Sequence, residues 1–230
     1  MTNVIDRPSK YSRDYLRKLF KYTLGEDIAN AVSHVVGSFF GLYAVINLTW
    51  VSARYGNWLD SFAFITYGLT ILFMFLMSTL YHSMVNHTAR SVFKKLDHIS
   101  IYILIVGSYT PFVFSLIATY KAFILYGILV VFMILGIVFK SLHAGKFKKF
   151  STLVYIVMGW GSVILLPQII HKLPTWSLIF VLVSGVTYTV GAILYAFAKF
   201  RYSHMIWHIF VIIGVVFMYI AITFGILQYR

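Results

Sequence analysis

The chain has 230 residues, of which 60% are hydrophobic and only 11% are charged. Soluble domains have about a quarter of their residues charged, so this composition excludes a water-soluble globular protein. The 19 lysines and arginines against 6 acidic residues leave a net charge of +13. In so apolar a chain this excess is typical of loops facing an anionic cytoplasmic leaflet, and no nucleic-acid partner is expected. Because the chain has no cysteine, a bound metal must be held by histidine or carboxylate side chains.

Residues 1–27 form a basic segment without the apolar core of a signal peptide, and we expect it to be retained in the cytoplasm. Between Lys10 and Tyr22, apolar residues recur at helical spacing against lysines and arginines; they are Tyr11, Tyr15, Leu16, Leu19 and Phe20. This pattern predicts a short helix on the inner membrane surface, with a disordered basic tail as the alternative.

Seven stretches near 20 residues follow, each long and apolar enough to cross a hydrocarbon core of about 30 Å as a helix. They run over Ile28–Ala53, Leu59–Met84, Asp97–Thr119, Ala122–Lys140, Phe150–His171, Ser177–Ala198 and His204–Gln228. The stretches lack the alternation of membrane barrel strands. The sequence therefore predicts an all-α membrane protein in which residues 28–230 form one seven-transmembrane helix bundle.

The positive charges predict the orientation of this bundle. Of the 19 lysines and arginines, fifteen fall in the N-terminal segment and in the second, fourth and sixth loops. The other four fall singly in the remaining loops and at the C-terminus. We therefore expect a cytoplasmic N-terminus and a C-terminus outside the cell.

Polar residues collect at the cytoplasmic end of this topology. The second span ends there with His82, the third begins there with Asp97, and the seventh begins there with His204 and His208. Ionisable residues in membrane spans are costly, so they mark candidate functional sites. His98 follows Asp97 but points about 100° away on a helix, so we expect only one of the two to face the site.

The His204-x-x-x-His208 pair predicts a metal site, because residues four apart share one helix face and can grip one ion together. His82 supplies a third imidazole, and three protein ligands plus a water form the open geometry of a catalytic zinc site. Packing or interfacial histidines are the alternative, and imidazole also suits other divalent ions. We expect Asp97 to accept a proton from the water or orient it, and Ser78 to bond a ligand or the water. The structural alternatives are a carboxylate at a helix start and a serine bonded to its own helix.

Two patterns in the first span predict contacts with neighbouring helices. Glu26, Asn30 and His34 lie at positions i, i+4 and i+8 and predict a polar stripe that holds this span against the other polar ends. Ligation of the metal by His34 is the alternative. The G-x-x-x-G pattern of Gly37–Gly41 predicts a close approach to a neighbouring helix.

Four groups of residues carry a resemblance that covers nearly the whole chain from Glu26. They are Glu26…Asn30…His34, Ser78-Thr79-Leu80-Tyr81-His82, Asp97-His98…Gly107-Ser108-Tyr109-Thr110-Pro111-Phe112, and His204-x-x-x-His208. In these the chain resembles the bacterial hemolysin III family, within the progestin and adipoQ receptor superfamily that includes the adiponectin receptors. The resemblance implies a seven-helix bundle with a zinc ion near the cytoplasmic face. It also implies His82, His204 and His208 as ligands, Asp97 as the holder of the zinc-bound water, and Ser78 nearby.

The resemblance leaves three functions open. Relatives are linked to hydrolysis of ceramide and other lipid amides, so the first expectation is a zinc-dependent hydrolase of lipid amide or ester bonds in the bacterial plasma membrane. Membrane lipids are then its expected substrates, and the sequence leaves the question of protein partners open. The second is a non-enzymatic regulator or sensor of membrane state, in which zinc is structural. The third function is that of a pore-forming hemolysin, and only the family name suggests it.

Overall fold

The chain folds into a bundle of long helices, seen in a computed structural model that describes residues 19–143 and 146–227. The elements are α2 (Leu24–Tyr55), α3 (Trp58–Ser83), α4 (His87–Thr110), η1 (Pro111–Ile117), α5 (Tyr120–His143), α6 (Lys148–Trp160), η2 (Gly161–Leu165), α7 (Leu166–Lys172), α8 (Thr175–Phe197) and α9 (Ser203–Leu227). Together they make seven helical spans that are long and apolar enough to cross a membrane. No strand occurs in the described ranges, so the predicted all-α membrane fold is confirmed.

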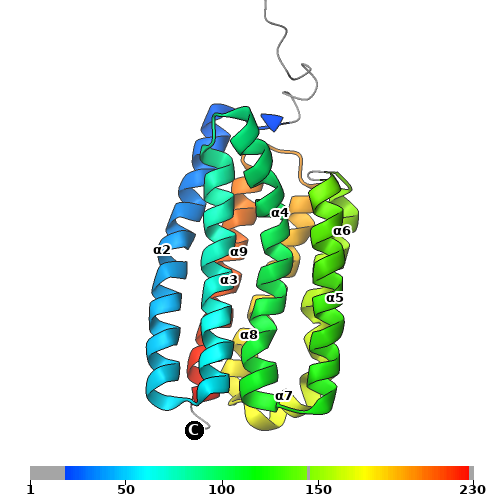
Figure 1. The fold of residues 1–230 in the computed structure, drawn as a ribbon. Coiled ribbons are helices and arrows are strands. Elements are labelled where there is room, and N and C mark those ends of the chain that lie inside the picture. Colours follow the sequence, from blue (N-terminus) through cyan, green and yellow to red (C-terminus); the bar gives the residue numbers. More distant parts are fainter. Residues whose placement is uncertain (1–18, 144–145, 228–230) are drawn as a thin grey trace, which may run out of the picture.

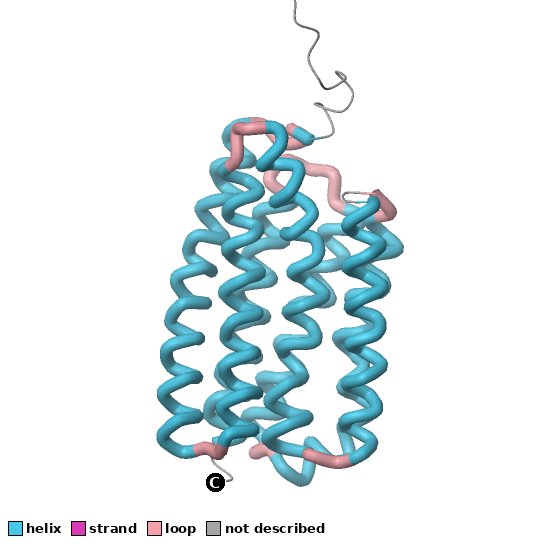
Figure 2. Tube along the Cα trace, in the orientation of Figure 1, coloured by secondary structure: helices cyan, strands magenta, loops and turns pink. Residues whose placement is uncertain are grey.

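The spans run alongside one another and are joined by short loops at the two ends of the bundle (Figures 1 and 2). Helix α3 packs between α2 and α4, α8 packs against α9 and α6, and α9 packs against α2. The start of α2 and the end of α9 lie at opposite ends of the bundle (Figure 1). The cytoplasmic placement of the N-terminus stays a prediction, and residues 10–18 of the predicted interfacial helix lie outside the described chain.

The third span begins earlier than the sequence predicts. Helix α4 starts at His87, ten residues before Asp97, because the Asn86 side chain accepts hydrogen bonds from the backbone of Thr88 and Ala89. The prediction of Asp97 as the first residue of this span was therefore wrong, and so was the alternative of a helix-start carboxylate. The charged residues that suggested a loop lie within the first turns of the helix.

Two spans change their helical form along their length. Pro111 starts a π-helical continuation of α4 that ends at Ala118, whose φ of 46° is left-handed. The predicted fifth span, Phe150–His171, is three consecutive pieces, α6, η2 and α7. Gly161 and Pro167 fall in this region, where small or imino residues loosen the regular hydrogen-bond ladder.

The close approach predicted for the G-x-x-x-G pattern is confirmed between α2 and α3. A Cβ atom on Gly41 would lie 2.7 Å from the Cα of Leu72, and one on Gly37 would lie 2.4 Å from the ring of Phe75. Real atoms do not approach so closely, so only glycine permits this contact. The two helices are thereby held together next to the polar ends that form the site.

Candidate metal centre

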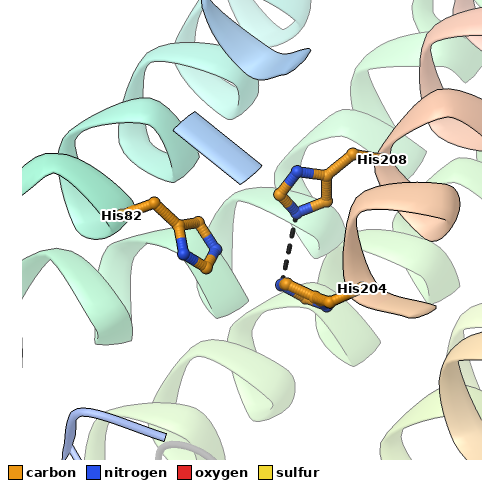
Figure 3. Close-up of side chains that lie close together, drawn as sticks. All are labelled: His82, His204 and His208. Carbon is orange, nitrogen blue, oxygen red and sulfur yellow. Dashed lines mark hydrogen bonds between the residues drawn. The ribbon is translucent and has the colours of Figure 1, made fainter. Parts of the chain in front are cut away.

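Three imidazoles converge at one end of the bundle. His82 comes from the last turn of α3, and His204 and His208 come from the first two turns of α9 (Figure 3). One ring nitrogen from each lies within 4.8 Å of the other two, so the group could hold a metal ion. The Nε2 atoms of His204 and His208 are 3.2 Å apart, because residues four apart stack on one helix face. The structure thus brings the three predicted ligands together.

Hydrogen bonds orient two of these rings. The Nδ1 atom of His82 lies 2.9 Å from Oδ1 of Asp27, and its buried Nε2 has no partner in the described structure. His208 Nδ1 lies 3.2 Å from the carbonyl oxygen of Asn30 and 3.1 Å from Oγ of Ser33. When Nδ1 donates its proton to such an acceptor, Nε2 carries the lone pair that a metal needs. The arrangement therefore presents both Nε2 atoms as ligands.

A buried arginine holds the carboxylate behind His82. Arg90 of α4 donates to Oδ2 of Asp27 at 2.6 Å, and also to the carbonyl oxygens of Leu19 at 3.2 Å and Met84 at 3.0 Å. Charge-assisted bonds of this length are among the stronger ones in proteins. The network joins α2, α3 and α4 behind one imidazole, so it restrains the position of that ring.

The sequence analysis missed Asp27 and assigned its place to Glu26. Asp27 and His34 are seven residues apart and lie within about 20° of one another on a helix, whereas Glu26 and His34 differ by about 80°. Glu26 instead closes a capping box with Thr23 and accepts a hydrogen bond from the Tyr202 backbone. The stripe therefore contacts neighbouring polar ends as predicted, but Glu26 reaches the segment before α9 rather than the histidines. The i, i+7 spacing of Asp27 and His34 was the available signal.

Asp97 and Ser78, the two predicted catalytic residues, lie beside the histidines rather than among the possible ligands. Asp97 lines the same cavity as His204 and His208, and its Oδ2 lies 3.3 Å from Nδ1 of His98. The hydroxyl of Ser78 is buried on α3, and Ser78 is not one of the residues that line this cavity. His98 lines this cavity too, but its Nδ1 lies 2.7 Å from the Lys94 carbonyl oxygen of its own helix, and it is not one of the converging histidines.

A fourth histidine lies against the cluster without joining it. The His34 ring stacks on His208, with centroids 3.6 Å apart and planes 17° apart. Both His34 ring nitrogens are buried and lack hydrogen-bond partners in the part of the chain that the structure describes. It is not one of the three residues whose ring nitrogens converge. Its contact is therefore a stacking contact with a candidate ligand.

A cavity of about 480 Å³ begins at the histidine cluster and continues into the bundle between α4, α6, α8 and α9. Its polar end is formed by His34, Asp97, His98, His204 and His208, and most of its remaining wall is apolar. Along α9 the wall reaches from His204 to Met218, which corresponds to about 21 Å of helix. A space of this length and character suits a hydrocarbon chain.

Residues 19–22, which we call the N-terminal strap, pass over the histidine cluster. The Tyr22 ring stacks on His204, with centroids 4.9 Å apart and planes 11° apart. Arg90 fixes the Leu19 carbonyl and lies over the Phe20 ring at 4.6 Å. Burial raises the pKa of the Tyr22 hydroxyl well above its usual range, so the side chain stays neutral at physiological pH. The strap covers the cluster with a neutral aromatic ring.

Comparisons with known proteins agree with this architecture. Residues 22–219 match the profile of the family described as Haemolysin-III related. The chain is 35% identical to Hemolysin-3 of Bacillus cereus over 202 residues, which cover 88% of this chain and 92% of the relative. It is 34% identical to the Hemolysin-3 homolog of Bacillus subtilis (strain 168) over 203 residues, 88% of this chain and 95% of the relative.

Proposed function

The chain belongs to the haemolysin-III related family, and we propose that it is a cell-membrane hydrolase that cleaves an amide or ester bond of a membrane lipid with a zinc ion. One observation carries the proposal. Two of the three converging histidines, His204 and His208, line the polar end of a long apolar cavity together with Asp97. An apolar chain in the cavity would bring its polar linkage to these side chains.

The donor set fits zinc. Zinc prefers imidazole nitrogens, and three protein ligands leave one position for a reacting group. His82 and His208 each have Nδ1 engaged by an oxygen, which leaves Nε2 for the ion, and the His82 Nε2 is buried without another partner. When bound, zinc supplies Lewis acidity, which lowers the pKa of water and polarises a carbonyl.

The protein's own side chains have separate tasks in this proposal. Asp97 takes the proton that the attacking water loses, as a carboxylate within reach of the reacting atoms can. The Ser78 hydroxyl, buried one helical turn before His82 on α3, donates a hydrogen bond to the attacking water. The apolar wall of the cavity binds the acyl chain and keeps water away from it.

The charge distribution supports an origin of the substrate in the inner leaflet. The histidine cluster lies at the end of the bundle where α2 and α9 begin and α3 ends. The lysine- and arginine-rich loops lie at the same end, which the positive-inside rule assigns to the cytoplasm. A lipid of the cytoplasmic leaflet would therefore have its linkage near the depth of the site.

The test measures fatty-acid release by the purified, zinc-loaded full chain with ceramide and other N-acyl and O-acyl lipids. Asp97→Asn is compared with Asp60→Asn, which removes another buried carboxylate near the start of α3, at the opposite end of the bundle from His82. We expect Asp97→Asn to lower the rate by about 100-fold or more and Asp60→Asn to retain it where the variant folds. Absence of release by the wild type, or equal rates for wild type and Asp97→Asn, would contradict the proposal.

A structural role for zinc is the second candidate, and the origin of the ligands favours it. His82 belongs to α3 and the other two belong to α9, so one ion would tie together helices far apart in the chain. In that case removal of zinc lowers the melting temperature. The rate of fatty-acid release then does not depend on Asp97, so Asp97→Asn and the wild type give equal rates. The rate comparison and a melting curve with and without chelator separate the two candidates.

A further inference from the structure

A second polar group lies beside the cavity, and it lines a small pocket formed by the end of α5, the start of α6 and parts of α4 and α8. We call this the lysine pocket; its polar members are His98, Lys140, Lys146, Lys148, Ser151, Tyr155 and Tyr195. Three of the members are lysines and none carries a carboxylate. The pocket thus concentrates positive charge without an internal counter-charge.

Lys140 shows that this charge needs a partner. The residue is only 1% exposed, although lysines at helix ends normally extend into water. Its Nζ atom donates to the carbonyl oxygen of Lys146 at 3.1 Å, the one hydrogen bond it makes with described residues. An ammonium group has three donors, so two remain for another acceptor. A buried charge is costly unless it is paired, which favours an anion beside Lys140.

Lys148 adds a second cation to the lining of the pocket. Its Nζ atom lies 4.0 Å from the centroid of the Tyr195 ring, and the cation–π contact holds it over that ring. The hydroxyls of Ser151 and Tyr155 each donate to a backbone carbonyl oxygen at 3.2 Å. Lys140 and Lys148 both retain N–H donors for a ligand in the pocket.

The lysine pocket adjoins the large cavity. Both are lined by His98, Ile101, Tyr155 and Tyr195. The pocket itself has a volume of about 10 Å³, which is room for about one water-sized group. It can therefore take an oxygen of a larger ligand whose apolar part lies in the cavity.

We propose that the lysine pocket binds one phosphate oxygen of an anionic lipid whose acyl chain enters the apolar cavity. Lys140 and Lys148 are its cationic partners, and two ammonium groups match the charge of a phosphate better than that of a neutral headgroup. The inner leaflet supplies such lipids. This binding does not depend on hydrolysis at the histidine cluster.

The test measures the dissociation constants of phosphatidylglycerol and of a phosphate-free diacylglycerol with identical acyl chains, for the full chain in neutral detergent. We expect phosphatidylglycerol to bind about tenfold more tightly. Lys140→Gln and Lys148→Gln should each remove about that factor, whereas Lys199→Gln should change it less than about twofold. Lys199 is the matched control because it is exposed near the same end of the bundle and lies outside the pocket.

A titration with inorganic phosphate alone distinguishes two sources of the oxyanion. Binding of free phosphate that is lost in Lys140→Gln would support the pocket with a soluble anion as its ligand. Binding of the lipid alone would support it with the headgroup as the ligand. Equal affinity for the two lipids, or an equal loss in Lys199→Gln and Lys140→Gln, would overturn the proposal, because surface charge would then explain the binding.

A melting curve gives a second measurement that does not need the ligand. Without an anion, Lys140→Gln should melt at a higher temperature than the wild type, because it removes an unpaired buried charge. Phosphatidylglycerol should raise the melting temperature of the wild type and not that of Lys140→Gln. Where Lys140→Gln does not fold, the half-buried Lys148→Gln carries the binding test.

Discussion

The Nδ1 atom of His82 lies 2.9 Å from a carboxylate oxygen of Asp27, and the other oxygen of that carboxylate accepts a 2.6 Å hydrogen bond from Arg90. The first residue is on α3, the second on α2 and the third on α4. The Nδ1 edge of the His82 ring is thereby linked to residues of α2 and α4, and its Nε2 atom is left for a ligand. Such carboxylate–histidine pairs raise ligand basicity and hold ring orientation in metal sites.

The first prediction concerns this pair. Asp27→Asn should weaken zinc binding by about 10- to 100-fold, because it removes the negative acceptor that orients His82. Glu26→Gln is the matched control, since it removes the neighbouring carboxylate, which contacts Thr23 and Tyr202 instead. The dissociation constant for zinc is measured by competition with a chromophoric chelator. Equal constants for the two variants would show that Asp27 does not support the site.

The second prediction separates the ligands from the histidine stacked on them. His208→Phe should lose bound zinc, whereas His34→Phe should keep about one zinc per chain, because His34 lies outside the converging group. Both changes replace an imidazole with an aromatic ring, so the stacking pair keeps two rings. Metal content per purified chain is measured by elemental analysis. Loss of zinc in both variants would make His34 a ligand.

The third prediction concerns the N-terminal strap. Tyr22→Ala should speed the removal of zinc by a chelator by about 2- to 12-fold, since a stacked ring contact contributes about 0.5–1.5 kcal/mol. Tyr22→Phe keeps the ring over His204 and should release zinc at the wild-type rate. The rate is measured after mixing zinc-loaded protein with excess chelator. A faster release from both variants would assign the effect to the hydroxyl rather than to the ring.

The fourth prediction concerns the contact between α2 and α3. Gly41→Ala should lower the free energy of unfolding by about 1–3 kcal/mol, because its Cβ would meet the Leu72 backbone. Gly127→Ala should change it by less than about 0.5 kcal/mol, since a Cβ there meets no atom within 4 Å. Melting temperatures in the same detergent provide the comparison. A Gly41→Ala variant as stable as Gly127→Ala would mean that the helices separate without cost.

Much of the fold followed from composition alone. In hydrocarbon, backbone groups must be bonded within the segment, so seven long apolar stretches leave little choice but seven helices. The order and the bounds of these stretches also predicted that His82 ends one span, that His204 and His208 begin another, and that all three lie at one end of the bundle. Depth in the membrane is a property of position along the chain, and the sequence therefore predicted it.

The start of α4 could not be read in this way. Arg90 suggested a loop because a charge in a span is costly, but in the structure Asp27 and two carbonyl oxygens satisfy its guanidinium. A hydropathy value assigns a cost to the charge of Arg90 and takes no account of the groups that bond it. A partner far away in the chain becomes visible only when the helices are packed.

The sequence by itself determined which polar residues share one depth, because helix rise and span order set that depth. Tertiary structure decided which of them meet, because rotation and lateral packing of each helix are set by contacts such as Gly41 against Leu72. It selected Asp27 over Glu26 as the partner of His82 and stacked His34 on His208. It also opened the cavity beside Asp97, since a cavity exists only between side chains of several helices.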